Sequence, residues 1–247
     1  NPSLVGSEMC IRDSHYILNG SKTFITNGQK SGLVIVVAKT DTAAGAKGIS
    51  LFLVEADLDG FSKGKNLKKL GMKAQDTSEL FFQDVKVAKE NLLGEEGRGF
   101  IYLMQDLPQE RLSIAVGAVA SAQALLAATV DYTKERKAFG TSVASFQNTQ
   151  FKLAELATEI TSAEVFCDRC TELLLEDKLD TVTASKAKLL TTELQCRVAD
   201  ECLQLHGGWG YMWEYPVCRA FADSRVQRIY GGSDEIMKLI ISRDLMK

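Results

Sequence analysis

The sequence predicts an α+β protein in which an antiparallel β domain is followed by a helical bundle. Over the first hundred residues, β-branched and aromatic residues form short runs separated by Gly, Asn and Asp, as in an antiparallel sheet. From Gly99 onward, apolar residues recur at the helical spacing of about 3.6 residues. We therefore place a boundary near residues 94–99, with the β domain at 15–95 and the helical domain at 96–247. A length of 247 residues is enough for two modest domains.

The strands are predicted from five apolar runs, which cover residues 16–18, 23–26, 33–39, 49–55 and 79–84. Asn19-Gly20 and Asn27-Gly28 are dipeptides typical of tight turns, so we expect each to close a hairpin. Residues 1–14 have no clean period, and residues 5–14 resemble translated adapter sequence left on assembled environmental reads. We therefore expect residues 1–14 to be a non-native segment outside the fold.

Three long segments of helical period follow the boundary. The first ends at Val130, the second covers residues 151–175, and the third places on one face Ala184, Ala187, Leu190, Leu194, Val198, Cys202 and Leu205. The third is expected to end at Gly207-Gly208, because glycine takes the left-handed cap conformation. A last helix is predicted to begin after Ser233 as N-cap, followed by two acidic residues that suit the helix dipole.

Residues 112–130 carry no charge and are long enough to span a bilayer. They are rich in Ala, Gly, Ser, Gln and Thr rather than in Leu and Ile, which favours a buried bundle helix. We therefore expect no integral membrane segment.

The charge balance excludes several classes of partner. There are 29 Lys and Arg against 32 Asp and Glu, which gives a net charge of −3 and no electrostatic reason to propose nucleic acid or an anionic membrane. Two histidines are too few for a multi-histidine site, so no metal centre is predicted.

The six cysteines are expected to be reduced thiols of an intracellular protein. Cys167 and Cys170 form a C-x-x-C pair, which is compatible with a redox dithiol or half of a zinc site. Both also belong to the apolar stripe of the second helical segment, and a thioredoxin-type pair would need a preceding strand. Core packing is therefore the favoured interpretation.

The segment around Pro108 allows two interpretations. In the first, Asp106 caps a helix that starts at Pro108, and Glu110 only complements the helix dipole. In the second, Glu110 enters an Ala-rich buried bundle, loses hydration and becomes a general base with a raised pKa.

Three further segments also have a structural and a functional interpretation. Residues 134–140 fit a charged helix end or an arginine aimed at phosphate, and residues 204–210 fit a helix cap or a bare backbone that a phosphate or ring can approach. Residues 230–233 fit a simple turn or an oxyanion-binding helix start. A run of lysines is expected to form a solvated face: Lys63, Lys65, Lys68, Lys69 and Lys73.

Taken together and in order, these motifs resemble the acyl-CoA dehydrogenase flavoprotein family. The resemblance covers residues 15–247 and rests on residues 24–28, 67–73, 136–140, 204–211 and 229–236. The long-chain branch is most similar at residues 107–112 and 209–216.

The resemblance implies part of the family's middle β domain followed by its C-terminal four-helix bundle. The family's N-terminal helical domain has no counterpart here, so we expect residues 15–247 expressed alone to purify with little FAD. The implied reaction is α,β-dehydrogenation of a fatty acyl-CoA thioester in β-oxidation, with FAD as cofactor and electron-transfer flavoprotein as acceptor. A homotetramer, built as a dimer of dimers, is also implied, in bacterial cytoplasm or the mitochondrial matrix.

Residue roles are likewise implied by the resemblance. Most relatives carry the catalytic base just after the tyrosine that Tyr230 matches, where this chain has Gly231; the long-chain and isovaleryl branches carry it at the position of Glu110. Glu110 is therefore the candidate base. The implied flavin contacts are Phe24, Ile25, Thr26, Arg136, Gln147, Gln204, Leu205, His206, Gly207, Gly208, Ser233, Asp234 and Glu235. The implied acyl-CoA contacts are Pro108, Gln109, Arg111, Gly231 and Gly232, with the Gly231 N–H facing the thioester carbonyl.

Two alternatives remain open at this point. An acyl-CoA oxidase shares the fold but passes electrons to oxygen, and a truncated bundle could serve only as a non-catalytic oligomerisation module. A yellow protein that acyl-CoA bleaches in the absence of air would be an enzyme rather than such a module.

Overall fold

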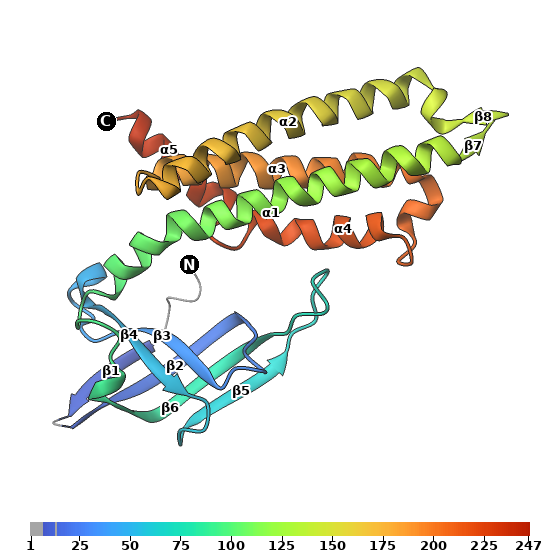
Figure 1. Cartoon of the computed structure of the whole chain (residues 1–247). Coiled ribbons are helices and arrows are strands. Elements are labelled where there is room, and N and C mark those ends of the chain that lie inside the picture. Colours follow the sequence, from blue (N-terminus) through green and yellow to red (C-terminus); the bar gives the residue numbers. More distant parts are fainter. Residues whose placement is uncertain (1–6, 13) are drawn as a thin grey trace. The chain divides into compact units, whose positions relative to one another are not determined.

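The computed structural model describes residues 7–12 and 14–247 and separates into two compact units, 1–105 and 106–247 (Figure 1). Strands give way to helices at Gly99, where helix α1 (Gly99–Glu135) begins. The division between the units falls inside α1, between Gln105 and Asp106.

The first unit is built on a six-stranded sheet with the order β4-β3-β1-β2-β6-β5. The strands are β1 (Ser7–Arg12), β2 (His15–Thr26), β3 (Leu33–Lys39), β4 (Ile49–Glu55), β5 (Phe61–Asn66) and β6 (Thr77–Ala88). All neighbouring pairs are antiparallel except β1 and β3, which are parallel. Its core contains Leu18, Phe52, Val54 and Leu80, all fully buried. The predicted antiparallel β domain is confirmed, with one parallel pair added.

Strand β1 corrects the expectation that residues 1–14 stand outside the fold. Ser7–Arg12 pairs with β2 from Ser7↔Gly20 to Arg12↔His15 and also contacts β3. A sheet recruits a strand through backbone N–H and C=O groups, which any sequence supplies, so a missing apolar period does not exclude pairing. Residues 1–6 and 13 lie outside the described residues, and the foreign origin of the segment stays a prediction.

Neither predicted hairpin turn forms a hairpin. Asn19 and Gly20 lie inside β2 at an irregularity of its pairing with β6, where the Asn19 amide donates to Asp84 Oδ1 at 3.0 Å and the Asp84 N–H donates back at 2.7 Å. Asn27, with φ 60°, does end β2, but the next strand along the chain lies on the far side of β1. Both dipeptides can form turns, but the pairing of the strands in the sheet decides whether a turn there joins two neighbouring strands.

The lysine run is not simply a solvated face, because two of its members tie loops together. Lys63, on the unpredicted strand β5, donates to the carbonyls of Gln29 at 3.0 Å and Ser31 at 2.6 Å. Lys69 donates to the Gln75 carbonyl and to Thr77 Oγ1.

The second unit is a helical bundle, as predicted, and the described chain has five α-helices. After α1 these are α2 (Gln147–Leu175), α3 (Thr181–His206), α4 (Pro216–Ser224) and α5 (Asp234–Leu245). The N-cap at Ser233 and the end of α3 before Gly207, with φ 60°, are confirmed. Helix α4 was not predicted, although Pro216 stands at its first position, where proline is favoured.

Helix α1 rules out the first interpretation of the segment around Pro108. Because the helix begins at Gly99 and continues through Pro108, the proposed helix start after Asp106 is wrong. Proline has no N–H to donate to the Met104 carbonyl, so one helical hydrogen bond is missing there.

Helix α1 is, among the described helices, the one long and apolar enough to cross a membrane by length and composition. Its residues Leu112, Ala115 and Val119 are buried in one cluster with residues of α2 and α3. This packing supports the prediction of a core helix.

Helix α3 buries more than its predicted stripe. Leu190 is 48% exposed, whereas Lys188, Thr191 and Thr192 are essentially inaccessible. The apolar stripe therefore located the helix but not its whole buried face.

Cys167 and Cys170 are buried in the bundle core, which confirms core packing over redox chemistry. Burial raises the pKa of Cys167 to about 11 and also raises that of Cys170.

We therefore predict that these two thiols resist alkylation while the protein is folded. Because burial blocks access to both thiols and their raised pKa values favour the unreactive protonated form, iodoacetamide at about pH 8 should label half-buried Cys218 at least ~10-fold faster than either. Mass spectrometry of labelled peptides measures the rates, and labelling in urea is the control. Rapid native labelling of Cys167 would show that the core opens.

Candidate active site

The loop at residues 229–233, here the Gly231 loop, joins the short 3₁₀ helix η6 (Arg225–Arg228) to α5. Gly231 has φ 64° and Gly232 φ 102°, a region that other residues rarely adopt. A Cβ atom on Gly231 would lie 2.5 Å from Ile114 Cδ1, so the loop lies directly against α1.

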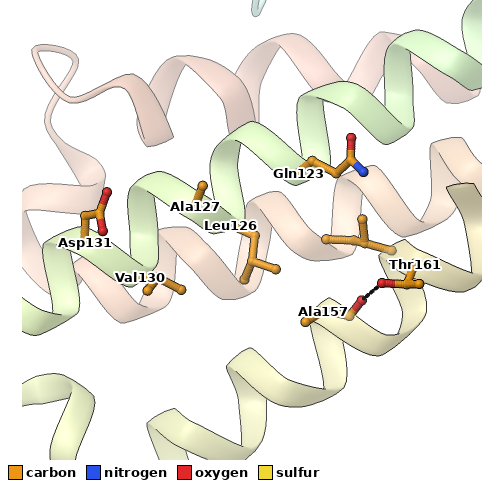
Figure 2. Close-up of a pocket in the computed structure, with 8 residues that line it drawn as sticks. Gln123, Leu126, Ala127, Val130, Asp131, Ala157 and Thr161 are labelled. Atoms are coloured by element: carbon orange, nitrogen blue, oxygen red, sulfur yellow. Dashed lines mark hydrogen bonds between the residues drawn. The ribbon is translucent and has the colours of Figure 1, made fainter.

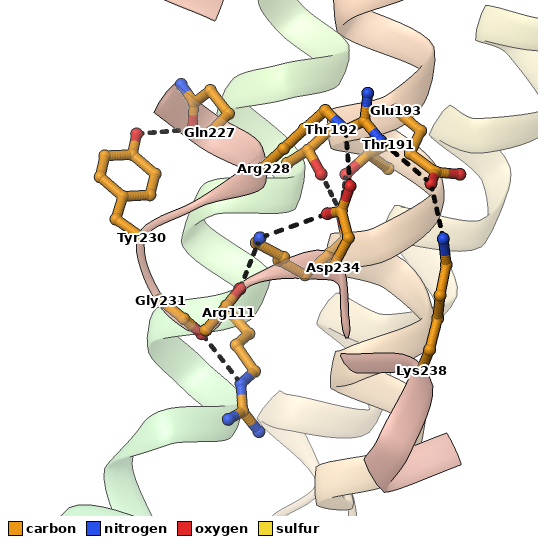
Figure 3. Close-up of polar contacts among 12 residues, drawn as sticks. Arg111, Thr191, Thr192, Glu193, Gln227, Arg228, Tyr230, Gly231, Asp234 and Lys238 are labelled. Carbon is orange, nitrogen blue, oxygen red and sulfur yellow. Dashed lines mark hydrogen bonds and ion pairs between the residues drawn. The ribbon is translucent and has the colours of Figure 1, made fainter. Parts of the chain in front are cut away.

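Two buried cations hold successive carbonyls of this loop (Figure 3). Arg111 is 4% exposed; its Nε donates to the Gly231 carbonyl at 3.3 Å and its Nη1 to Ser185 Oγ at 3.4 Å. Lys188 on α3 is fully buried, and its Nζ donates to the Gly232 carbonyl at 2.8 Å. Burial lowers the pKa of both groups, and the neighbouring Glu110 carboxylate opposes that shift for Arg111.

A chain of ion pairs continues from Lys188 through Asp234. Asp234, buried at the first position of α5, accepts from Arg228 Nε at 2.5 Å, and its other oxygen lies 3.9 Å from Lys188 Nζ. Arg228 also reaches Glu193 at 3.5 Å, and Lys238 reaches the same carboxylate at 3.3 Å (Figure 3). The hydrogen bond with Asp234 raises the pKa of Arg228.

Glu110 is solvent-exposed in this chain, which corrects the expectation that the bundle buries it. Its neighbours Arg111 and Leu112 turn into the bundle instead, at 4% and 3% exposure. Glu110 and Ile114 are four residues apart and so share a face of α1, with Cβ atoms about 5–6 Å apart. Since Ile114 touches Gly231, Glu110 stands one helical turn from the Gly231 loop. Pro108 is buried and Gln109 exposed on the same stretch.

A second group of predicted residues forms an open pocket of about 460 Å³, here the Arg136 pocket. It is lined by Tyr132, Arg136, Val143, Gln204, Leu205, His206, Gly207, Gly208, Trp209 and Met212. The structure thus brings Arg136 together with the predicted segment 204–208. Gln147, exposed on the first turn of α2, is not part of the lining.

The glycines of this pocket border open space. Nothing lies within 4 Å of a Cβ placed on Gly207 or Gly208, whereas a Cβ on Gly210 would lie 2.3 Å from the Leu203 carbonyl. Gly210 is therefore needed for packing, and Gly207 and Gly208 leave a bare backbone beside the Arg136 guanidinium. Such a surface can take an anionic or planar group.

His206 supports the pocket wall. Its Nδ1 donates to the Cys202 carbonyl at 2.8 Å, and its ring stacks on Tyr132 at 4.1 Å between centroids. The Tyr132 hydroxyl donates to the His206 carbonyl at 3.2 Å. These contacts hold the His206 ring and the Tyr132 ring against the end of α3.

The predicted flavin residues of the bundle therefore fall into two places. Ser233, Asp234 and Glu235 belong to the Gly231 loop and the start of α5, at the level of Lys188, whereas the Arg136 pocket lies at Gln204. Sixteen residues of α3 separate Lys188 from Gln204, which is about 24 Å at the helical rise.

In the first unit, Phe24, Ile25 and Thr26 end β2 at a second pairing irregularity. Phe24 has φ 62° and is 66% exposed, while Ile25 packs against the sheet core. An exposed aromatic residue in a strained conformation is typical of a binding surface.

Two residues escaped the sequence analysis. Phe139 stands at the turn of a hairpin formed by β7 (Lys137–Ala138) and β8 (Thr141–Ser142), with φ 53° and 98% exposure. The sequence feature that could have identified Phe139 is its position before Gly140 in the motif at residues 136–140. The other is Lys188, whose signal was its place on the α3 stripe four residues after Ala184.

Apart from these two places, the described residues form a further depression and no cluster of potential metal ligands. A depression of about 380 Å³ between α1 and α2 is lined mainly by apolar groups, and its Thr161 hydroxyl already donates to the Ala157 carbonyl (Figure 2). Among the described residues, no three His, Cys, Asp or Glu side chains gather as metal ligands.

Comparison with known proteins extends over nearly the whole chain. The mitochondrial long-chain specific acyl-CoA dehydrogenase of Mus musculus is 57% identical over 235 residues, which are 94% of this chain and 55% of that protein. The chain thus spans about half the length of the curated relatives it matches.

Solved structures agree. An acyl-CoA dehydrogenase from Geobacillus kaustophilus is 48% identical, with a TM-score of 0.95 over 98% of this chain and 64% of the other. An acyl-CoA dehydrogenase complexed with FAD from Bacillus anthracis is 32% identical, with a TM-score of 0.90 over 98% and 44%.

Family patterns match in the order that the fold requires. The acyl-CoA dehydrogenase middle domain matches residues 3–85, and the acyl-CoA dehydrogenase C-terminal domain matches residues 97–246. With the sheet in the first match and the bundle in the second, the chain belongs to the acyl-CoA dehydrogenase family.

Proposed function

We propose that this chain is the greater part of an FAD-dependent enzyme that introduces an α,β double bond into fatty acyl-CoA thioesters. The observation that carries the proposal is the position of Glu110, one turn along α1 from the Gly231 loop. A carboxylate that can accept a proton thus stands beside a loop that can present N–H groups.

The residues of the Arg136 pocket fit the cofactor. Its guanidinium and bare glycine backbone suit the pyrophosphate and adenosine part of FAD, and Gln147 would add a contact from the start of α2. In the first unit, Phe24, Ile25 and Thr26 are proposed to contact a flavin ring. In the second unit, residues 233–235 are proposed as further FAD contacts. Bound FAD supplies the hydride acceptor.

The distance between the Arg136 pocket and the Gly231 loop supports the assembly of several copies of this chain. Because the Arg136 pocket and the Gly231 loop are about 24 Å apart along α3, each is proposed to serve a different flavin, with the pocket completing the site of a neighbouring copy. A homotetramer, and electron-transfer flavoprotein as acceptor, follow from the family resemblance. The proposed location is bacterial cytoplasm or mitochondrial matrix.

The chemistry requires an acidic α proton. The Gly231 N–H would donate to the thioester carbonyl and stabilise the negative charge that develops there, while Glu110 accepts the α proton. Pro108, Gln109, Arg111 and Gly232 would line the acyl-CoA site. The exposure of Glu110 in this chain leaves its carboxylate accessible to a substrate.

We predict that Glu110→Gln in the full-length enzyme lowers kcat by at least ~10²-fold, because the amide keeps the shape but cannot accept a proton. FAD content and acyl-CoA affinity should stay within about threefold, since the amide removes proton acceptance and little binding. Stopped-flow reduction of the flavin under nitrogen measures the step. Glu135→Gln, at the end of the same helix, is the matched control. Unchanged turnover in Glu110→Gln would refute the assignment of the base.

We predict that Arg136→Ala weakens FAD retention by about 10- to 100-fold, because it removes a charge-assisted contact to the pyrophosphate. The ratio of flavin to protein absorbance after dialysis measures retention, and light scattering follows the oligomer. The neighbouring exposed residue gives the control Lys137→Ala. Equal retention in both variants would show that Arg136 is only a helix-end charge.

A further inference from the structure

The side chain of Lys188 is completely buried, yet it ends in a group that strongly prefers water. Two partners meet its Nζ: the Gly232 carbonyl at 2.8 Å and Asp234 Oδ1 at 3.9 Å. Asp234 is itself held by Arg228, so the lysine is the inner end of a fixed network. Among the contacts of the described residues, its hydrogen bond to Gly232 is the one that reaches the Gly231 loop.

Lys188 and Arg111 together fix two consecutive peptide planes. In a peptide the C=O and the following N–H point in opposite directions. Arg111, by holding the Gly231 carbonyl, turns the Gly232 N–H of the same plane away from itself. Lys188 holds the next plane, which joins the Gly232 carbonyl to the Ser233 N–H. Both glycines are at positive φ and have no side chain, so nothing else in these two residues restricts the orientation of the planes.

The donors of the loop are left free by this arrangement. Across residues 7–12 and 14–247, the N–H groups of Gly231 and Gly232 donate no hydrogen bond, although Ile229 and Tyr230 just before them both donate to the Val226 carbonyl. A loop held on both sides with its central donors unpaired is arranged to receive an acceptor from outside.

We propose that Lys188 is a positioning residue, which anchors the Gly232–Ser233 peptide at the end of the Gly231 loop, so that the loop keeps the conformation in which the free N–H groups of Gly231 and Gly232 are aimed at the acyl-CoA thioester carbonyl. This inference rests on the proposed function. Lys188 itself touches neither substrate nor cofactor in this role. Asp234 and Arg228 act behind it by holding its ammonium in place.

A purely stabilising role predicts something different. Removing one member of a buried charged pair is strongly destabilising when it leaves the other charge without a partner, and much less so when the other charge stays paired. Lys188→Met keeps the length of the side chain and leaves Asp234 paired with Arg228. If Lys188 serves only packing, the loop should keep its order and the enzyme its rate.

The first test measures the loop without relying on activity. In the full-length enzyme with FAD, hydrogen exchange followed by mass spectrometry should show the amides of residues 230–237 exchanging about tenfold faster in Lys188→Met. Lys186→Met, exposed on the same helix, should leave exchange unchanged. If hydrogen exchange in Lys188→Met is the same as in the unsubstituted enzyme, the proposal is overturned, whether or not the variant is active.

The second test separates positioning from stability. Lys188→Met should lower kcat about 10- to 100-fold with KM within about threefold, because the misaligned donors stabilise developing charge more than they bind substrate. A 3-thiaacyl-CoA, which has an acidic α proton but sulfur where the hydride would leave, should bind with its α proton less acidic than in the unsubstituted enzyme. Cys202→Ala, a core truncation on the same helix, is the control for lowered stability.

Different results would refute the proposed function and the role of Lys188. That function fails if the unsubstituted enzyme does not oxidise acyl-CoA or if Glu110→Gln keeps its rate. The inference fails if kcat survives in Lys188→Met, or if Cys202→Ala lowers kcat as much. Should Lys188→Met not fold, Lys188→Gln, whose amide can still donate, is measured instead; it should show an intermediate exchange rate and kcat, and unchanged values overturn the inference.

Discussion

The hydrogen bond from the buried Lys188 ammonium to the Gly232 carbonyl is the interaction on which the candidate site depends. An ammonium removed from water must find oxygen partners, and the partners here come from the loop and from the first residue of α5. Because Asp234 also binds Arg228, the same network fixes where α5 begins. The loop, the helix after it and the two helices beside it are therefore positioned together rather than one at a time.

The charged residues that the bundle buries, Arg111, Lys188 and Asp234, lie together where function is proposed, whereas buried polar residues elsewhere in it, such as Thr129 and Gln195, are uncharged. Cys167, Cys170 and the small residues of α1 pack without charge along the middle of the helices. Charged side chains lie at the Gly231 loop, as Lys188 and Arg111, and at the other end of α3, where Arg136 lines its pocket. The long helices thus act as spacers that hold two polar sites apart at a distance set by helical rise.

The sequence predicted most of the fold because apolar spacing is a local property. The change of period at Gly99 located the boundary between sheet and bundle, and Ser233 marked the last helix correctly. Sheet pairing is not local, which is why Asn19-Gly20 was taken for a turn and why β1 was missed. No short motif records which strand will lie beside another.

The sequence predicted which residues belong to the candidate site, but not how buried or exposed each of them is. The order of motifs identified the family, and with it Glu110 and the Gly231 loop. It did not show that Glu110 faces solvent in this chain, since a helix face is decided by what packs against it. Nor did it show Lys188 buried, because a lysine on an apolar stripe looks like an interruption until its oxygen partners are known.

The contact between Gly231 and Ile114 limits how such an enzyme can change in evolution. A base placed directly after Tyr230, in place of the proposed Glu110, would need a side chain where this chain has a glycine at φ 64°, and its Cβ would lie 2.5 Å from Ile114 Cδ1. Moving the base to that position therefore takes more than exchanging two carboxylates. The flexible end of Ile114 must turn aside and the loop backbone must leave its positive φ, so the side-chain contact and the backbone both constrain such an exchange.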